Sequence, residues 1–159
     1  MADLTEICAL CRNYFLKDYT DTSKSIHDGT YTISNGVITD VSFLKIGQYF
    51  RITGSDLNDG VYLNSGGAIS ELHDETFNGA VWAMSVPPAF IRLAEDIEKW
   101  RATNEAVDST NMSPFNSESF GGYSYSKSGG GSGSGGGTNA TWQGQFSKRL
   151  QAWKRIYIL

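Results

Sequence analysis

The chain is organised around the stretch Ser117-Glu118-Ser119-Phe120-Gly121-Gly122-Tyr123-Ser124-Tyr125-Ser126. Tyrosine, phenylalanine and serine suit an edge strand, and the paired glycines let the backbone bend. The stretch is not a self-contained domain. We therefore expect an extended, hydroxyl-rich arm over Glu118–Ser126 that adds a strand to another chain. The residues expected to make this contact are Glu118, Phe120, Gly121, Gly122, Tyr123 and Tyr125.

A tether and a closing helix follow the arm. Residues 129–137 are only glycine and serine, a composition typical of a flexible coil, and engineered linkers share it. The spacing of apolar residues then predicts a helix from Trp142, with Thr141 as its N-cap. Residues 142–159 carry a charge of +4 and no acid, whereas the rest of the chain carries −8. This asymmetry favours contact between the closing segment and an acidic protein surface or nucleic acid, although four cations are also common on a solvated helix face.

The arm and the closing segment together resemble the head–tail connector (adaptor) proteins of tailed bacteriophages. The pattern is SES-x-G-x-YS-x-S after an acidic helix, followed by a terminal helix with Leu150 and Trp153-Lys154-Arg155. The likeness covers residues 88–159 and, loosely, the first helix, and it includes no catalytic residue. This chain departs from the simplest members in its glycine–serine run and in a β-rich block between the first two helices.

This resemblance implies a structural virion protein of the phage neck. Copies would form a twelve-subunit ring beneath the portal, extend the DNA channel and support the next stopper or tail-completion protein. Packaged DNA would pass through without sequence-specific binding, and the protein would be made in the host cytoplasm, away from membranes. The arm would join neighbouring subunits. The expected portal-binding residues are Trp142, Phe146, Arg149, Leu150, Trp153, Lys154, Arg155, Tyr157 and Leu159.

The N-terminal residues predict a first helix that ends near Tyr19. Asp3 and Glu6 suggest a capping box, and apolar residues follow at helical spacing. Cys8 and Cys11 lie at i and i+3 on its apolar side. We interpret them as buried small hydrophobic residues rather than as a redox pair or half of a zinc site.

In residues 27–86 the spacing of apolar residues changes to every second position, which is typical of β-strands. Asn35-Gly36 between β-forming residues is the strongest hairpin signal in the chain, because a type I′ turn needs positive φ at both positions. Further strands are expected at Tyr49–Thr53 and Val61–Leu63, with two more after Gly66-Gly67 (68–72) and after Asn78-Gly79 (80–86). Five or six short antiparallel strands predict a small β-barrel or sandwich.

Pro87-Pro88 opens the clearest helix, whose apolar stripe includes Phe90, Leu93 and Ile97. The resulting fold class is α+β. Residues 1–26 and 87–159 would form a bundle of N-terminal, middle and C-terminal helices, with an extended arm over 103–141. Residues 27–86 would form the inserted β domain.

No motif in the sequence indicates catalysis, a cofactor or a metal site. The phosphate-loop, serine-hydrolase and zinc-protease patterns are absent, so we expect no enzyme. Asp56–Gly60 resembles the start of a calcium loop, but the required glutamate is missing, and a hairpin turn is the better interpretation. No run of 18 apolar residues predicts a membrane span, and the start lacks a secretory signal pattern.

Other functions stay open. A stopper or tail-completion protein would use the β block as its main body. A β-rich carbohydrate- or peptide-binding module would use Tyr31, Tyr49, Tyr62 and Trp82, although aromatic residues on strands are more often core. The apolar stripe of the closing helix would, in the alternative, simply cover the other helices.

Overall fold

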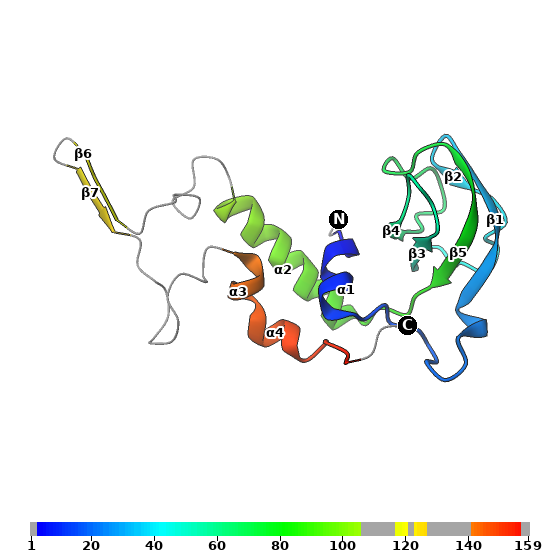
Figure 1. The fold of residues 1–159 in the computed structure, drawn as a ribbon, viewed down its shortest axis with the longest axis horizontal. Helices are drawn as coiled ribbons and strands as arrows, with labels where there is room; N and C mark the ends of the chain where they lie inside the picture. Colours follow the sequence, from blue (N-terminus) through cyan, green and yellow to red (C-terminus); the bar gives the residue numbers. More distant parts are fainter. Residues whose placement is uncertain (1–2, 106–116, 121–122, 127–140, 157–159) are drawn as a thin grey trace.

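The computed structural model describes residues 3–105, 117–120, 123–126 and 141–156, with the backbone alone for the two middle ranges. Figure 1 shows helices between a curled sheet at one end and a hairpin at the other. The helices are α1 (Thr5–Cys11), α2 (Pro88–Asn104), α3 (Trp142–Gln145) and α4 (Ser147–Gln151), with a short 3₁₀ helix η1 (Thr22–Lys24). The strands are β1 (Ile26–Ser34), β2 (Val37–Ile38), β3 (Tyr49–Thr53), β4 (Gly60–Leu63), β5 (Glu75–Ala83), β6 (Ser117–Phe120) and β7 (Tyr123–Ser126).

Strands β1 to β5 form one antiparallel sheet in the order β2-β1-β5-β3-β4. The long strands β1 and β5 pair along their length, from Ile26 opposite Trp82 to Ile33 opposite Glu75. The Asn35-Gly36 hairpin is confirmed, because both residues have positive φ and Ser34 pairs with Val37. The turn between β3 and β4 is confirmed as well.

The predicted barrel or sandwich is wrong. The sheet is single and curls into a half-barrel, because its edge strands β2 and β4 do not pair with each other (Figure 1). Residues 68–72, expected to be a strand, form a turn at Ser70-Glu71 within irregular backbone instead. Asn78-Gly79, interpreted as a turn signal, lies inside β5.

The predicted bundle of N-terminal, middle and C-terminal helices is also wrong, although an α+β class is loosely compatible with this mixed fold. Helix α1 stops at Cys11 because Arg12 adopts a left-handed conformation (φ 52°). Its N-cap is Leu4 rather than Asp3, whose Oδ1 accepts a hydrogen bond from the Thr5 N–H at 2.8 Å. The closing helix is broken at Phe146 (φ −102°, ψ 11°), which separates α3 from α4.

Helix α2 is confirmed. Pro87 is its N-cap and Pro88 occupies the first turn, where a missing N–H costs nothing. Its buried stripe is Phe90, Leu93, Ala94 and Ile97. Burial of both cysteines is confirmed too, since Cys8 and Cys11 are fully buried and free.

Two hydrophobic cores lie on opposite faces of strands β3 and β4. Tyr49 and Val61 belong to the core that packs against the helices. Phe50 belongs to the core inside the curl, and Tyr62 packs against that core. Alternation along a strand places neighbouring side chains on opposite faces, so β3 and β4 contribute to both cores. The described helices include none long and apolar enough to cross a membrane.

Candidate functional site

The closing segment is seated on the helices by buried side chains. The Thr141 hydroxyl accepts a hydrogen bond from the Gly144 N–H at 3.2 Å, which confirms the predicted N-cap of α3. Trp142 and Leu150 are each only 1% exposed and lie in the core shared with α1 and α2. Burying two such large side chains contributes several kcal/mol to folding, on the order of 2–3 kcal/mol each.

A second set of contacts holds the end of this segment. The Trp153 ring contacts the rings of Phe15 and Phe90, with centroids 5.8 and 5.5 Å away. The Asn13 Nδ2 donates a hydrogen bond to the Trp153 carbonyl at 2.9 Å. The Arg155 N–H donates to the Cys11 carbonyl at 2.9 Å. These bonds tie the closing segment to the last residue of α1 and to the turn that follows it.

The cations of the segment differ in their surroundings. Arg149 forms an ion pair with Asp96 at 2.9 Å, and the Arg155 guanidinium lies 3.6 Å from the centre of the Tyr19 ring. The Arg155 Nε is buried and has no hydrogen-bond partner within the described residues. Lys148 and Lys154 are exposed, and neither forms an ion pair with any residue that the structure describes. A basic, solvent-facing surface therefore remains beside a firmly packed anchor.

The expected portal-binding residues thus fall into three groups. Trp142 and Leu150 are core, and Phe146 and Trp153 are partly buried against that core. Arg149 and Lys154 are exposed, and Arg155 is half-buried. Tyr157 and Leu159 lie outside the described residues. Ile156, which the sequence did not single out, is 84% exposed where the described part of the segment ends.

The expected arm forms a hairpin of its own. β6 and β7 pair antiparallel, with Glu118 opposite Tyr125 and Phe120 opposite Tyr123. Gly121 and Gly122, between the strands, lie outside the described residues. The hairpin makes a separate two-stranded sheet and lies far from β1–β5 in Figure 1. An isolated two-stranded hairpin is marginally stable in water, so its open edges favour pairing with a further strand.

Packing of the closing segment on the other helices was the alternative interpretation of its apolar stripe, but the role of Asn13 in holding it was missed from the sequence. Asn13 accepts hydrogen bonds from the Phe15 N–H and the Tyr19 hydroxyl, and it donates to the Trp153 carbonyl. Its partner in the closing segment is about 140 residues away in sequence. The only local signal was an asparagine inside an otherwise apolar helical pattern.

Both cysteine thiols are buried and free. Burial, followed by the nearby Cys11, raises the pKa of the Cys8 thiol to about 12, and burial also raises the pKa of Cys11. Thiolates are the reactive form, and burial disfavours the thiolate at both positions. Within the described ranges, no three histidine, cysteine or acidic residues are grouped so that they could hold a metal.

Comparison with protein-family models, with curated proteins and with solved structures found no match to this chain.

Proposed function

We propose that this protein is a structural subunit of the tailed-phage neck, where copies form a ring that joins the portal to the next head-completion or tail protein. The observation that carries this function is the separate β6–β7 hairpin. It coincides with the segment whose sequence resembles the arm of head–tail adaptors.

The hairpin supports ring formation on physical grounds. Each of its two strands has one edge without a partner among the described strands. A strand edge on one subunit that pairs with a different surface of the next makes a head-to-tail contact, and such contacts close into rings when the rotation is suitable. Main-chain hydrogen bonds would supply most of the affinity.

The closing segment supports attachment to a second protein. Its core residues pack against α1 and α2. Ile156 is exposed, and it is followed in sequence by Tyr157-Ile158-Leu159. An anchored base with the exposed Ile156 next to it suits insertion into a groove of another protein. Lys148 and Lys154 beside it would add contacts with an acidic rim.

The function is tested in a phage whose copy of this gene carries Tyr125→Pro. Proline removes a ladder N–H from β7 and disfavours strand pairing. Heads and tails should accumulate separately in lysates, with packaged DNA leaking from the heads, as seen by electron microscopy. The matched variant Tyr125→Ala keeps the backbone donor and should still give virions. Intact virions from the proline variant, at wild-type yield, would overturn the ring function.

A stop codon at Trp142 is a less specific test, because it removes the core residues Trp142 and Leu150 as well as the residues that follow them. A stop codon at Tyr157 removes only the last three residues. We expect the folded protein to accumulate while heads and tails stay separate. Normal virions from this truncation would exclude the end of the chain as the portal contact.

A further inference from the structure

Arg51 is a half-buried cation that no acidic group in the described part of the chain neutralises. It lies in the middle of β3, opposite Val61 of β4 and Trp82 of β5, on the same face of the sheet as Tyr49. Its guanidinium forms no hydrogen bond with a described residue, and none of its nitrogens is fully buried. The five N–H donors of this partly buried side chain are therefore left for a ligand.

Two aromatic rings hold this guanidinium in place. Its Cζ lies 3.7 Å from the centre of the Tyr14 ring and 4.4 Å from the centre of the Trp82 ring. The two rings meet edge to face with centres 5.8 Å apart, and the Trp82 Nε1 donates a hydrogen bond to the Thr53 hydroxyl at 3.3 Å. Stacking uses the flat face of a guanidinium and leaves the donors at its edge free. The donors are thus oriented before a ligand arrives, which lowers the entropy cost of binding.

Arg155 repeats this arrangement. Its Cζ lies 3.6 Å from the centre of the Tyr19 ring, whose hydroxyl donates a hydrogen bond to the Asn13 Oδ1 at 2.7 Å. Arg155 forms no ion pair with a described residue, and its Nε is buried without a hydrogen-bond partner among them. Tyr14 and Tyr19 both pack against one small buried cluster, so the two guanidinium groups flank the same aromatic surface. The members of the cluster are Leu16, Ala80 and Trp82.

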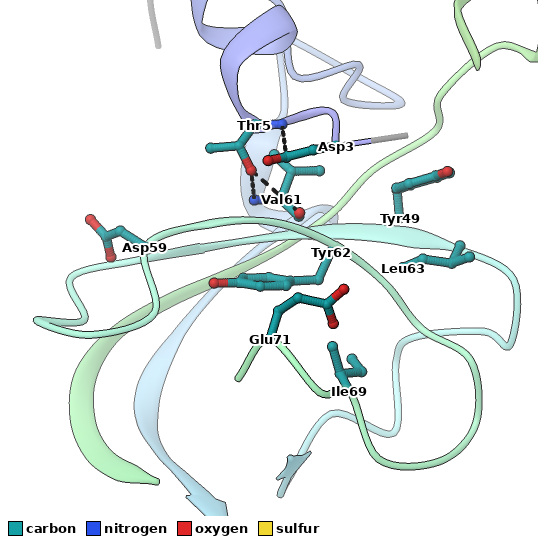
Figure 2. A pocket seen from close by; sticks show the side chains of 9 residues that line it. All are labelled: Asp3, Thr5, Tyr49, Asp59, Val61, Tyr62, Leu63, Ile69 and Glu71. Carbon is teal, nitrogen blue, oxygen red and sulfur yellow. Dashed lines mark hydrogen bonds between the residues drawn. The ribbon is translucent and has the colours of Figure 1, made fainter. Parts of the chain in front are cut away.

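Acidic groups of the chain are engaged or gathered elsewhere. Asp18, next to Tyr19 in sequence, accepts hydrogen bonds from the Thr20 N–H and the Thr20 hydroxyl at 2.8 and 2.6 Å. Figure 2 shows a pocket beside β4 whose charged side chains are all acidic, and neither Arg51 nor Arg155 lines it. These acidic side chains are Asp3, Asp59 and Glu71. Both arginines therefore lack a countercharge within the described residues.

The surroundings favour a carboxylate of a protein over a phosphate of a nucleic acid. The edge of a guanidinium can donate two parallel hydrogen bonds to either group. Ile156 directly follows Arg155 and is 84% exposed, and it offers an apolar contact that a sugar–phosphate backbone does not use. A nucleic acid would also bring about one negative charge per 1.7 Å to a chain whose net charge is −4. An acidic peptide segment brings only a few charges, so it meets less repulsion.

We propose that Arg51 and Arg155 bind two carboxylates of an acidic segment of a partner protein, which lies across the surface formed by Tyr14, Tyr19 and Trp82. Arginine, tyrosine and tryptophan are the residue types that contribute most to binding energy at protein interfaces. The site goes beyond the ring function, because it requires neither the β6–β7 hairpin nor residues 157–159. It predicts a partner whose contact surface is acidic.

The test is an NMR titration of the ¹⁵N-labelled full chain. The probes are acetylated hexapeptides with two glutamates at varied spacing, and the matched control peptides carry glutamines instead. We expect the Nε–H signals of Arg51 and Arg155 and the indole N–H signal of Trp82 to shift with the glutamate peptides and not with the neutral ones. A short oligothymidylate is titrated in parallel as the nucleic-acid probe.

Arg51→Lys keeps the charge but removes the planar fork of donors, and it should weaken binding about fivefold or more. Arg51→Gln removes the charge as well and should weaken binding at least as much. Arg92→Gln changes net charge equally at an exposed position of α2, and it should change affinity less than about twofold. Equal losses in Arg51→Gln and Arg92→Gln would reduce the effect to general charge attraction and overturn the site. Unchanged affinity in Arg51→Lys, no shift of the three signals in the wild type, or tighter binding of oligothymidylate than of the peptides would overturn it as well.

Discussion

Glu75 fixes the loop between β3 and β4 through a single carboxylate. It accepts hydrogen bonds from the Ser55 hydroxyl, from the Asp56 and Leu57 N–H groups at 2.9 and 3.4 Å, and from the Asn58 Nδ2 at 2.9 Å. Donors to the ionised form favour it, and they lower the pKa of Glu75 below its usual range, with the Ser55 hydroxyl contributing most.

This shift predicts how stability depends on pH. Because the folded-state pKa of Glu75 lies below its unfolded value, its contribution is fully present above about pH 4.5. It is lost as the pH falls through the folded-state pKa. Glu75→Gln should therefore reduce the loss of unfolding free energy between pH 6 and pH 3, measured by urea denaturation. Glu95→Gln, an exposed carboxylate of α2, is the control and should leave that loss unchanged. The same pH dependence in Glu75→Gln and wild type would contradict this role.

The loop between β3 and β4 is held by a residue that its own sequence pattern does not include. Asp56–Gly60 was expected to be a turn rather than a calcium loop, and it does connect β3 to β4. The residue that organises it is Glu75, the first residue of β5. Its bonds span 17 to 20 residues, so only tertiary structure brings these groups together.

At the scale of elements, β5 shows glycine in a packing role rather than at a turn. Asn78-Gly79 was interpreted as a turn, yet β5 continues through it from Glu75 to Ala83. A Cβ on Gly79 would lie 2.0 Å from the Thr53 carbonyl oxygen, so the end of β3 and its following turn approach β5 only because no side chain is present. Glycine inside a strand marks such a close backbone approach.

Gly79→Ala should destabilise the protein by about 3 kcal/mol or more, because backbone atoms rather than a flexible side chain must move. Gly29 provides a matched control, since it lies directly opposite Gly79 in the β1–β5 ladder. A Cβ on Gly29 would meet only the Tyr31 side chain, at 3.7 Å or more. Gly29→Ala should change stability by less than about 1 kcal/mol. Chemical denaturation measures both, and equal effects would refute the close-approach explanation.

At the scale of the whole molecule, the sequence predicted elements better than their assembly. The periodicity of α2, the Asn35-Gly36 hairpin and the burial of Cys8 and Cys11 follow from local rules, and all are confirmed. The break at Phe146 and the end of α1 before the left-handed Arg12 are backbone geometries that the apolar periodicity did not indicate. Whether the sheet closes into a barrel depends on whether the edge strands β2 and β4 pair, and the sequence pattern of each strand does not indicate this. The functional assignment and its residues stay predictions.

Strands β3 and β4 make the two cores one folding unit. Tyr49 faces the helical core, and Phe50, the next residue, faces the core inside the curl. The helical core cannot open without loosening β3, and loosening β3 exposes the inner core. Cooperative unfolding is therefore expected, although residues 27–86 were predicted to be a separate inserted domain.

Trp142→Ala tests this coupling from the far end of the helical core. Truncating a tryptophan that is 1% exposed should cost about 3–5 kcal/mol, a large part of the stability of a domain this size. Hydrogen exchange should show β1–β5 amides losing protection together with those of α2, because both belong to the same transition. Lys148→Ala, on the exposed side of the same segment, should leave both unchanged. If Trp142→Ala lowered protection in α2 alone, the curled sheet would be an independent unit, and its core would not need the helices.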